Sequence, residues 1–328
     1  MAKSGFAAVT TDEETPVVTE STIPLNDLKF DDVELCDLGN KLPVGIYLKE
    51  ERLTDFILKP FSGTDEVDLG KMVEANSDRD GNLKEPATVL KGFLPKVIES
   101  IGGYSIPDLA KQLQTSPQRL FEDMYLADSI TLILSIRLQA QGWEIAMSGK
   151  CPECGTIATD NPDKGRLYHD LSSLEVRLIP SRFSQKPIIE LTLPEPWLLY
   201  EDTITKLWLE PMKLRQLDKL LKSNSGNPKD MDQVFEMVVG IPESTDYANK
   251  KGRLFDPALY ADFCTGTNGK ISPNKQALYD AIAKIVPGPK MEAEMDCGNS
   301  RCRNHWTQYI PWISFREFLY FTPSAPKE

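Results

Sequence analysis

The chain has 328 residues, of which 41% are hydrophobic and 26% are charged, a balance typical of soluble globular proteins. Its 49 acidic and 37 basic residues give a formal net charge of -12. Nucleic acids and anionic membranes both bind basic surfaces, so this charge argues against either as the main partner. No apolar stretch approaches the ~20 residues that a membrane-spanning helix needs.

The acidic residues are concentrated at the start of the chain. Residues 1–40 contain nine acidic and two basic residues, and they carry -7 of the total charge of -12. Residues 1–22 are rich in Thr, Glu and small side chains, so we expect a flexible acidic arm there. This stretch lacks the basic start and apolar core of a signal peptide, which predicts a cytosolic setting with reduced or metal-bound cysteines.

A strand pair is expected at the start of the folded part. Leu42–Leu48 and Leu53–Leu58 flank a charged turn, and their apolar residues alternate as in half-buried strands. Ser62 and Asp65 then have the spacing of a capping box, which predicts a short helix. Apolar residues recur at helical spacing from Val89 to Ile101, and Pro95 within that pattern predicts a kink or a break near Lys91.

Two further helices are expected before the middle of the chain. Ile106–Leu113 predicts a short one, and Ser116-Pro117 predicts the start of a long one that ends near Gly142. The long helix has few polar positions and should be central in its half of the protein. We expect its Asp128 and Arg137 to make buried structural hydrogen bonds or a subunit contact rather than to act in catalysis.

The second half of the sequence repeats the order of features in the first. Leu193-Pro194 aligns with Leu42-Pro43 at an offset of 151 residues. The same offset matches Thr54 with Thr205, Leu58 with Leu209, Pro60 with Pro211 and Leu69 with Leu220. Gly142 and Gly288 each stand nine residues before a cysteine. We therefore expect an α+β fold, a tandem pseudo-repeat of strand pair plus helices spanning 23–177 and 178–328, joined by a zinc-binding cysteine site.

The cysteine spacing is the most specific local signal. In Cys151-Pro152-Glu153-Cys154-Gly155 two thiolates can point toward one ion, and the glycine allows the chain to turn back with a positive φ. Cys297 and Cys302 form the second pair. Four thiolates make a closed tetrahedral set, so Cys151, Cys154, Cys297 and Cys302 predict a structural zinc site.

Other interpretations of these cysteines remain open. A lone CxxC pair is also typical of a redox pair or of a metal site that has been lost, and the stretch between Cys154 and Cys297 is far longer than in a compact zinc ribbon. The internal repeat favours one shared site, because it would bring the two turns to the same place. His305 is the alternative ligand, while Cys36 and Cys264 have no partner spacing and are expected to be small buried or free thiols.

Motifs of catalysis are missing from the sequence. It contains no GxGxxG, GxxxxGK[ST], HExxH or GxSxG, and His169 and His305 are its only histidines. We therefore predict that the protein is not an enzyme; a hydrolase with a carboxylate pair would rest on composition alone. The aromatic run from Trp306 to Phe321 predicts either core packing or contact with a protein partner.

The order of these features resembles a known family. The strand pair after Leu42-Pro43, the helix start at Pro60–Glu66, the long helix with Asp128 and Arg137, Gly142 and the CPEC turn are similar to those of the baseplate hub assembly (chaperone-like) proteins of contractile-tailed, T-even-type bacteriophages. The similarity covers roughly residues 40 to 175. Members are often shorter, and the second half matches them only through the internal repeat.

The resemblance implies a structural or assembly protein of the phage tail baseplate, in its hub or wedge region. Its partners would be other tail and baseplate proteins, with homo-oligomers within a symmetric assembly, in the virion or in the host cytoplasm during assembly. The alternative is a zinc-ribbon adaptor that binds nucleic acid or the transcription machinery. The CPECG turn motivates that alternative, and the negative net charge opposes it.

Overall fold

The computed structural model describes residues 22–24, 35–36, 39–79, 83–147, 149–158, 167–180, 183, 186–223, 237–244, 262–265, 272–310 and 312. These residues form a mixed α and β fold, as expected. The acidic arm predicted for residues 1–22 lies outside the described residues except for Thr22, which begins strand β1. Among the described residues, no helix combines the length and apolar character needed to cross a membrane.

The predicted strand pair forms an antiparallel hairpin, which we call the first hairpin. It consists of β3 (Lys41–Leu48) and β4 (Glu51–Leu58), and β5 (Ile98–Ile101) and β6 (Tyr104–Ser105) complete a four-stranded sheet. The pairing shifts register between Lys41 and Ile46. Gly45 lies in this bulge with a φ of 85°, and a Cβ there would come within 2.7 Å of the Leu53 carbonyl oxygen, so the bulge requires glycine.

Four helices accompany the first hairpin: α1 (Gly63–Ala75), α2 (Pro86–Val97), α3 (Ile106–Gln112) and α4 (Pro117–Glu122). The capping box predicted at Ser62 is confirmed. The helix predicted to run as far as Ile101 is wrong at its end, because Ile98–Ile101 is strand β5. Pairing with β4 buries Ile98 and Ile101, and Gly102 and Gly103 take positive φ in the following turn.

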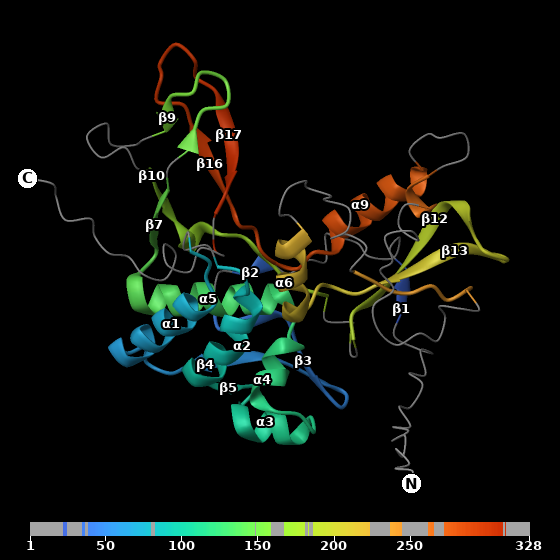
Figure 1. Cartoon of the computed structure of the whole chain (residues 1–328), viewed down its shortest axis with the longest axis horizontal. Coiled ribbons are helices and arrows are strands. Elements are labelled where there is room, and N and C mark those ends of the chain that lie inside the picture. Colours follow the sequence, from blue (N-terminus) through green and yellow to red (C-terminus); the bar gives the residue numbers. More distant parts are fainter. Residues whose placement is uncertain are drawn as a thin grey trace, which may run out of the picture.

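The single long helix predicted from Ser116 to Gln141 is also wrong, because it is interrupted between α4 and α5 (Leu126–Gln141). The interruption pairs with a distant segment: the Leu126 N–H donates to the Met212 carbonyl at 2.8 Å, and the Leu214 N–H donates to the Met124 carbonyl at 2.8 Å. As predicted, α5 is largely buried and ends at Gly142, which has a φ of 82°. Figure 1 shows α5 at the centre of its half of the molecule.

A second hairpin lies in the second half of the chain. It consists of β12 (Ile188–Leu199) and β13 (Asp202–Leu209), with β1 (Thr22–Pro24) parallel to β12 at one edge and β14 (Val238–Gly240) at the other. Its register shifts between Thr192 and Trp197, the positions equivalent to Lys41 and Ile46 in the first hairpin. Helix α6 (Leu214–Ser223) follows the hairpin, and α9 (Pro273–Ile285) lies against β12.

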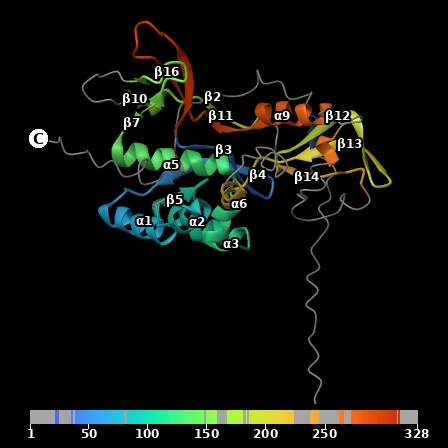
Figure 2. The ribbon, with the colours of Figure 1, turned by 45° about the horizontal axis from the view of Figure 1, so that its top comes forward.

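Six short strands form what we call the cysteine arm, which rises on the side of α5 opposite to α1–α4 (Figure 1, Figure 2). They are β7 (Glu144–Met147), β8 (Gly149–Lys150), β9 (Ile157–Ala158), β10 (Leu167–Asp170), β16 (Glu292–Asp296) and β17 (His305–Tyr309). They pair antiparallel as β7 with β10, β8 with β9 and β16 with β17.

A small three-stranded sheet lies between the cysteine arm and the hairpins. It orders β15 (Gly288–Pro289), β11 (Val176–Arg177) and β2 (Leu35–Cys36). The sequence of Leu171–Ile179, after the first cysteine pair, predicts a strand, and this prediction is largely wrong: Leu171–Ser173 form a 3-10 turn, η3, and only β11 is extended and paired. Asp170 stabilises that turn by accepting the Ser172 N–H at 2.8 Å, which explains why strand character begins only afterwards.

Two apolar clusters form the core, and each contains residues from both halves of the chain. The first surrounds α2 and α5 and includes Leu214 and Leu217 from α6. The second surrounds the second hairpin and α9 and includes Val44 from β3 and Ala127 from α5. The described parts of the two halves therefore share their buried surface rather than packing separately.

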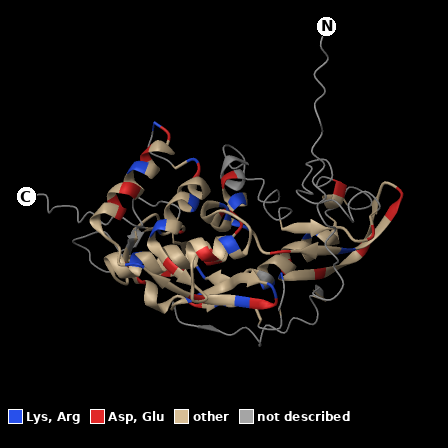
Figure 3. Ribbon diagram, turned by 90° about the horizontal axis from the view of Figure 1, so that it is seen from below, with Lys and Arg blue, Asp and Glu red and all other residues tan. Residues whose placement is uncertain are grey.

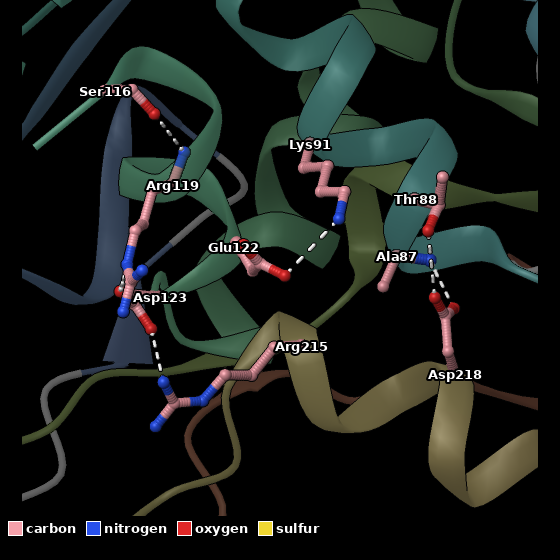
Figure 4. A network of polar contacts seen from close by, with 9 residues as sticks. All are labelled: Ala87, Thr88, Lys91, Ser116, Arg119, Glu122, Asp123, Arg215 and Asp218. Carbon is pink, nitrogen blue, oxygen red and sulfur yellow. Dashed lines mark hydrogen bonds and ion pairs between the residues drawn. The ribbon is translucent and has the colours of Figure 1, made fainter. Parts of the chain in front are cut away.

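Polar contacts reinforce the docking of α6 (Figure 4). Glu85, at the N-cap of α2, makes no side-chain capping bond. Instead Asp218 of α6 accepts the Ala87 N–H at 2.8 Å and the Thr88 hydroxyl at 3.3 Å. Arg215 forms an ion pair with Asp123 at 2.7 Å. The N-terminus of α2 is thus capped by a residue from the other half of the chain.

Candidate metal centre

The two cysteine pairs lie in the end turns of two hairpins of the cysteine arm. Cys151 and Cys154 lie between β8 and β9, and the Cys151 N–H donates to the Thr156 carbonyl at 2.8 Å. Cys297 and Cys302 lie between β16 and β17, where the Cys297 N–H donates to the Asn304 carbonyl at 2.9 Å. Each turn is therefore closed by a backbone bond from its first cysteine to the residue two positions after its second cysteine.

The residue after the second cysteine of each turn has left-handed backbone geometry. Gly155 has a φ of 73°, as the sequence predicted, and Arg303 has a φ of 51°. Glycine takes this conformation without strain, whereas arginine takes it at an energetic cost. The two turns therefore share a backbone geometry, but only the first turn, through Gly155, indicates it in the sequence.

The hairpins approach closely, so that their turns lie side by side at the tip of the cysteine arm (Figure 1, Figure 2). Gly149 of β8 faces β16 and β17: a Cβ at this position would overlap the Gln308 side chain and lie 3.1 Å from the Met295 methyl carbon. Met295 is buried in the first apolar cluster. A residue without a side chain at position 149 thus allows the contact that brings the two turns together.

All four sulfur atoms lie within 4.8 Å of one another. Cys151 Sγ and Cys302 Sγ are 3.8 Å apart, and Cys154 Sγ and Cys297 Sγ are 3.4 Å apart. Zinc–thiolate bonds of about 2.3 Å in a tetrahedron place sulfur atoms about 3.8 Å apart. A disulfide would require about 2.05 Å, and these cysteines are free. The four residues predicted from the sequence are therefore brought together, and their donor set and spacing suit a metal ion.

Backbone N–H groups surround the sulfur atoms in the same pattern in both turns. The N–H two residues after each cysteine faces its sulfur, namely those of Glu153, Thr156, Asn299 and Asn304. Contacts with the Thr156 side chain and N–H lower the pKa of Cys154 to about 6, whereas burial and the neighbouring cysteines raise the pKa of Cys302 despite its contact with the Asn304 N–H. Such N–H groups stabilise negative charge on sulfur, as a set of metal-bound thiolates requires.

Two residues near the sulfurs were not identified from the sequence. The Thr156 hydroxyl lies 3.2 Å from Cys154 Sγ, and Asn304 donates from its side-chain nitrogen to Cys151 Sγ at 3.6 Å. Both stand two residues after a cysteine, and that spacing is the signal that could have revealed them. Asn304 reaches from the second turn to the first, so it links the two hairpins directly.

The other candidate ligands lie outside this cluster. His305 is exposed at the start of β17, where its Nδ1 pairs with Asp296. Cys264 is a half-buried cysteine outside the cluster that forms no disulfide, and the side chain of Cys36 lies outside the described residues. With four protein thiols the cluster leaves no position open for a substrate, so its chemistry suits a structural metal ion.

Asp128 and Arg137 make buried hydrogen bonds at opposite ends of α5. The Asp128 carboxylate accepts the N–H groups of Val44 at 2.7 Å and of Gly45 at 3.0 Å, within the bulge of the first hairpin. Arg137 donates to the Glu144 carbonyl at 2.5 Å, where the chain enters the cysteine arm. Burial raises the pKa of Asp128 to about 7. These contacts fit the structural role that the sequence predicted.

Arg52 completes the contacts around the bulge. Its Nε donates to the Val44 carbonyl at 2.6 Å, and its Nη2 donates to the Pro43 carbonyl at 2.9 Å. Its Nη1 donates to the Ile179 carbonyl at 2.9 Å, in the segment that leads into the second half. The sequence suggested no such role for an arginine at the edge of a charged turn.

Comparison of the chain with protein-family models, with curated proteins and with solved structures finds no significant match. Its function is therefore inferred from the residues of the chain itself.

Proposed function

We propose that this protein is a non-enzymatic structural or assembly protein of a bacteriophage tail baseplate, in its hub or wedge region, with a structural zinc site. The observation that carries the proposal is the order of motifs from the hairpin after Leu42-Pro43 to the CPEC turn, which resembles the hub assembly family. The roles of Asp128 and Cys151 support it, because both residues hold separate segments of the fold together. The partners would be other tail and baseplate proteins, and the location the virion or, during assembly, the host cytoplasm.

Zinc is the proposed ion at the four cysteines. A closed set of four thiols favours zinc or an iron–sulfur site over harder ions, and zinc needs no redox partner. The backbone N–H groups that face the sulfurs support a bound, negatively charged thiolate set. A structural ion here would link β8–β9 to β16–β17 and so hold the tip of the cysteine arm together.

Metal analysis of the purified chain tests the centre directly. We expect one zinc ion per chain, lost in Cys151→Ser and equally in Cys297→Ser, because each turn supplies half of the ligands. Cys264→Ser is the matched control, since this thiol lies outside the cluster, and it should retain its zinc. Zinc content unchanged in either turn variant, or iron in place of zinc, would contradict the proposed site.

We also propose that the chain is a tandem pseudo-repeat. The two hairpins support this, because every strand pairing of the first, such as Ile46 with Leu53, recurs in the second at the offset found in the sequence. The helices that follow them, α1 and α6, begin at Gly63 and Leu214, which keeps the same offset. Asp128 and Asn274 each bond to the bulge of their own hairpin, although their positions do not keep that offset.

Fractionation of infected cells tests the phage assignment. Stoichiometric amounts of the chain in purified virions would support a structural component, and its restriction to the lysate would support an assembly chaperone. A coding neighbourhood without tail genes would contradict both. Salt-dependent binding to DNA or RNA at submicromolar protein would instead favour the zinc-ribbon adaptor; the exposed Glu292, Glu294 and Asp296 along β16 argue against that outcome.

A further inference from the structure

The outer face of the second hairpin carries the two most exposed large apolar side chains of the described residues. Leu198 is 71% exposed and Tyr200 is 75% exposed. The opposite face is fixed: Trp197 is buried, donates from Nε1 to Asp262 at 2.8 Å and contacts the ring of Phe263 edge-on at 5.1 Å. Leu198 is therefore held by strand β12, and Tyr200 lies in the turn that follows it with a φ of 55°, so that both side chains are presented to solvent beside a packed strand, as in a preformed docking surface.

The corresponding face of the first hairpin is covered. At the offset of 151 residues, Pro43, Tyr47 and Arg52 correspond to Pro194, Leu198 and Thr203. Pro43 is buried and Tyr47 and Arg52 are half-buried, whereas all three counterparts in the second hairpin are exposed. Burial also raises the pKa of Tyr47 to about 12. The two faces thus differ in what lies over them.

The cover on the first hairpin is an extended stretch of chain, Leu178–Pro180. The Ile179 N–H donates to the Pro43 carbonyl at 2.9 Å, and Arg52 donates back to the Ile179 carbonyl at 2.9 Å. The Ile179 side chain is buried in the second apolar cluster, which also contains Val44 and against which Tyr47 packs. One aliphatic residue before a proline therefore supplies both the backbone bonds and the apolar contact.

We propose that the outer face of the second hairpin binds an extended segment of another polypeptide, with an aliphatic residue followed by proline, in the manner of Ile179-Pro180 on the first hairpin. This inference rests on the pseudo-repeat proposed above and does not depend on the phage context. Addition of an extended segment to a hairpin edge is a common mode of peptide recognition.

Charge along the second hairpin further defines the segment. Glu195 in the bulge and Glu201 in the end turn are exposed, and acidic residues mark the far end of this ribbon in Figure 3. A bound segment with basic residues on either side of its aliphatic–proline step is therefore favoured. The chain's own cover has this pattern, because Arg177 and Arg182 flank Ile179-Pro180 in the sequence.

A fluorescent peptide with the sequence of residues 176–183, Val-Arg-Leu-Ile-Pro-Ser-Arg-Phe, is the probe. Fluorescence anisotropy with the full chain should show saturable binding, weakened about tenfold or more by Leu198→Asp, because a buried leucine contact is lost. Val67→Asp changes another exposed apolar residue, on α1, and should leave the affinity unchanged. A peptide with aspartate in place of its isoleucine should not bind.

Absence of binding to the unaltered chain, or equal binding to Leu198→Asp, would overturn the inference. Removal of residues 313–328 provides a further arm: affinity that rises tenfold would mean that the face is filled from within the chain, which also overturns it. Circular dichroism and zinc content identical to those of the unaltered chain verify that Leu198→Asp is folded. Because the assay uses neither virions nor infected cells, its failure would leave the phage assignment untouched.

Discussion

The two hairpins hold a register shift at equivalent positions with different side chains. In the first, the Asp128 carboxylate accepts the Val44 N–H, and the Arg52 guanidinium donates to the Val44 carbonyl. In the second, Asn274 does both: its side-chain oxygen accepts the Glu195 N–H at 3.0 Å, and its nitrogen donates to the Glu195 carbonyl at 2.9 Å. A neutral amide thus replaces two groups that carry opposite charges when ionised.

The difference shows what the charged pair adds. An amide side chain satisfies one peptide group locally and reaches no farther. The longer Arg52 also reaches the Ile179 carbonyl, so that it joins the first hairpin to the segment leading into the second half. The cost is a fully buried carboxyl group, and burial raises the pKa of Asp128. Arg52 thereby joins the first hairpin to the segment at Ile179, whereas the outer face of the second hairpin is exposed.

Truncation of Asp128 and of Asn274, which bond to the equivalent peptide groups of Val44 and Glu195, should have the largest effect on the comparison. Asp128→Ala leaves the buried N–H groups of Val44 and Gly45 without their acceptor, and we expect a loss of about 3 kcal/mol in the free energy of unfolding. Asn274→Ala should cost about 1 kcal/mol, because Glu195 is exposed and water can replace the amide. Urea unfolding followed by circular dichroism measures both; equal losses would contradict the asymmetry.

The pH dependence of stability should differ between the chain and Asp128→Asn. Because the pKa of Asp128 is raised to about 7 in the folded state, the native protein keeps a proton that the unfolded chain releases near its ordinary value of 3.8. Stability from this group is therefore lost as the pH rises, by about 2 kcal/mol between about pH 5 and about pH 7.

Urea unfolding of both proteins at several pH values measures this effect, since the contributions of all other groups cancel in the difference. A difference that stays constant from about pH 5 to about pH 7 would mean that Asp128 is already ionised in the native state at the lower pH.

Giving the first hairpin the side chains of the second tests whether the two arrangements are interchangeable. In Asp128→Asn with Arg52→Thr, the new amide can donate to the Val44 carbonyl that Arg52 has released, while the Gly45 N–H loses its acceptor in this variant and in Asp128→Asn alike. The double variant should therefore be about 1 kcal/mol more stable than the sum of the single losses predicts. A double-mutant cycle measures this coupling. Strict additivity would show that the Asn274 arrangement depends on its own surroundings.

The helices after the hairpins offer the smallest contrast. Asp218 on α6 caps α2, whereas its counterpart at the repeat offset, Val67 on α1, is exposed. Asp218→Ala should lower the free energy of unfolding by about 1 kcal/mol through loss of the cap. Val67→Ala should change it by no more than about 0.5 kcal/mol. Thermal unfolding of both variants compares them; equal effects would mean that the cap contributes nothing.

Local patterns predicted the parts of this fold that depend on neighbouring residues. Alternating apolar residues indicated the first hairpin, Ser62 and Asp65 indicated the start of α1, and Gly155 indicated the reversal after the first cysteine pair. In each case the physical cause lies within a few residues of its effect. The four cysteines were predicted for the same reason, since each turn carries its own spacing.

The features that were missed depend on distant partners. The break before α5 arises from bonds to Met212 and Leu214, which lie in the other half of the chain, and a helical apolar pattern continues straight through it. Ile98 fits a helical pattern as well as a strand, and pairing with β4 decides between them. The role of Arg52 depends on the carbonyl of Ile179, which is 127 residues away in the sequence.

The position of the cysteines also sets the order in which the molecule can be completed. Cys151 and Cys154 belong to the first half of the sequence, whereas Cys297 and Cys302 follow both hairpins and α9. During synthesis Cys151 and Cys154 therefore lack the other two cysteines of the cluster until the second turn has also left the ribosome. A chain that stops before Cys302 contains both hairpins and α5 but lacks the fourth cysteine at the tip of the cysteine arm. An intact tip thus reports that synthesis has passed the second turn.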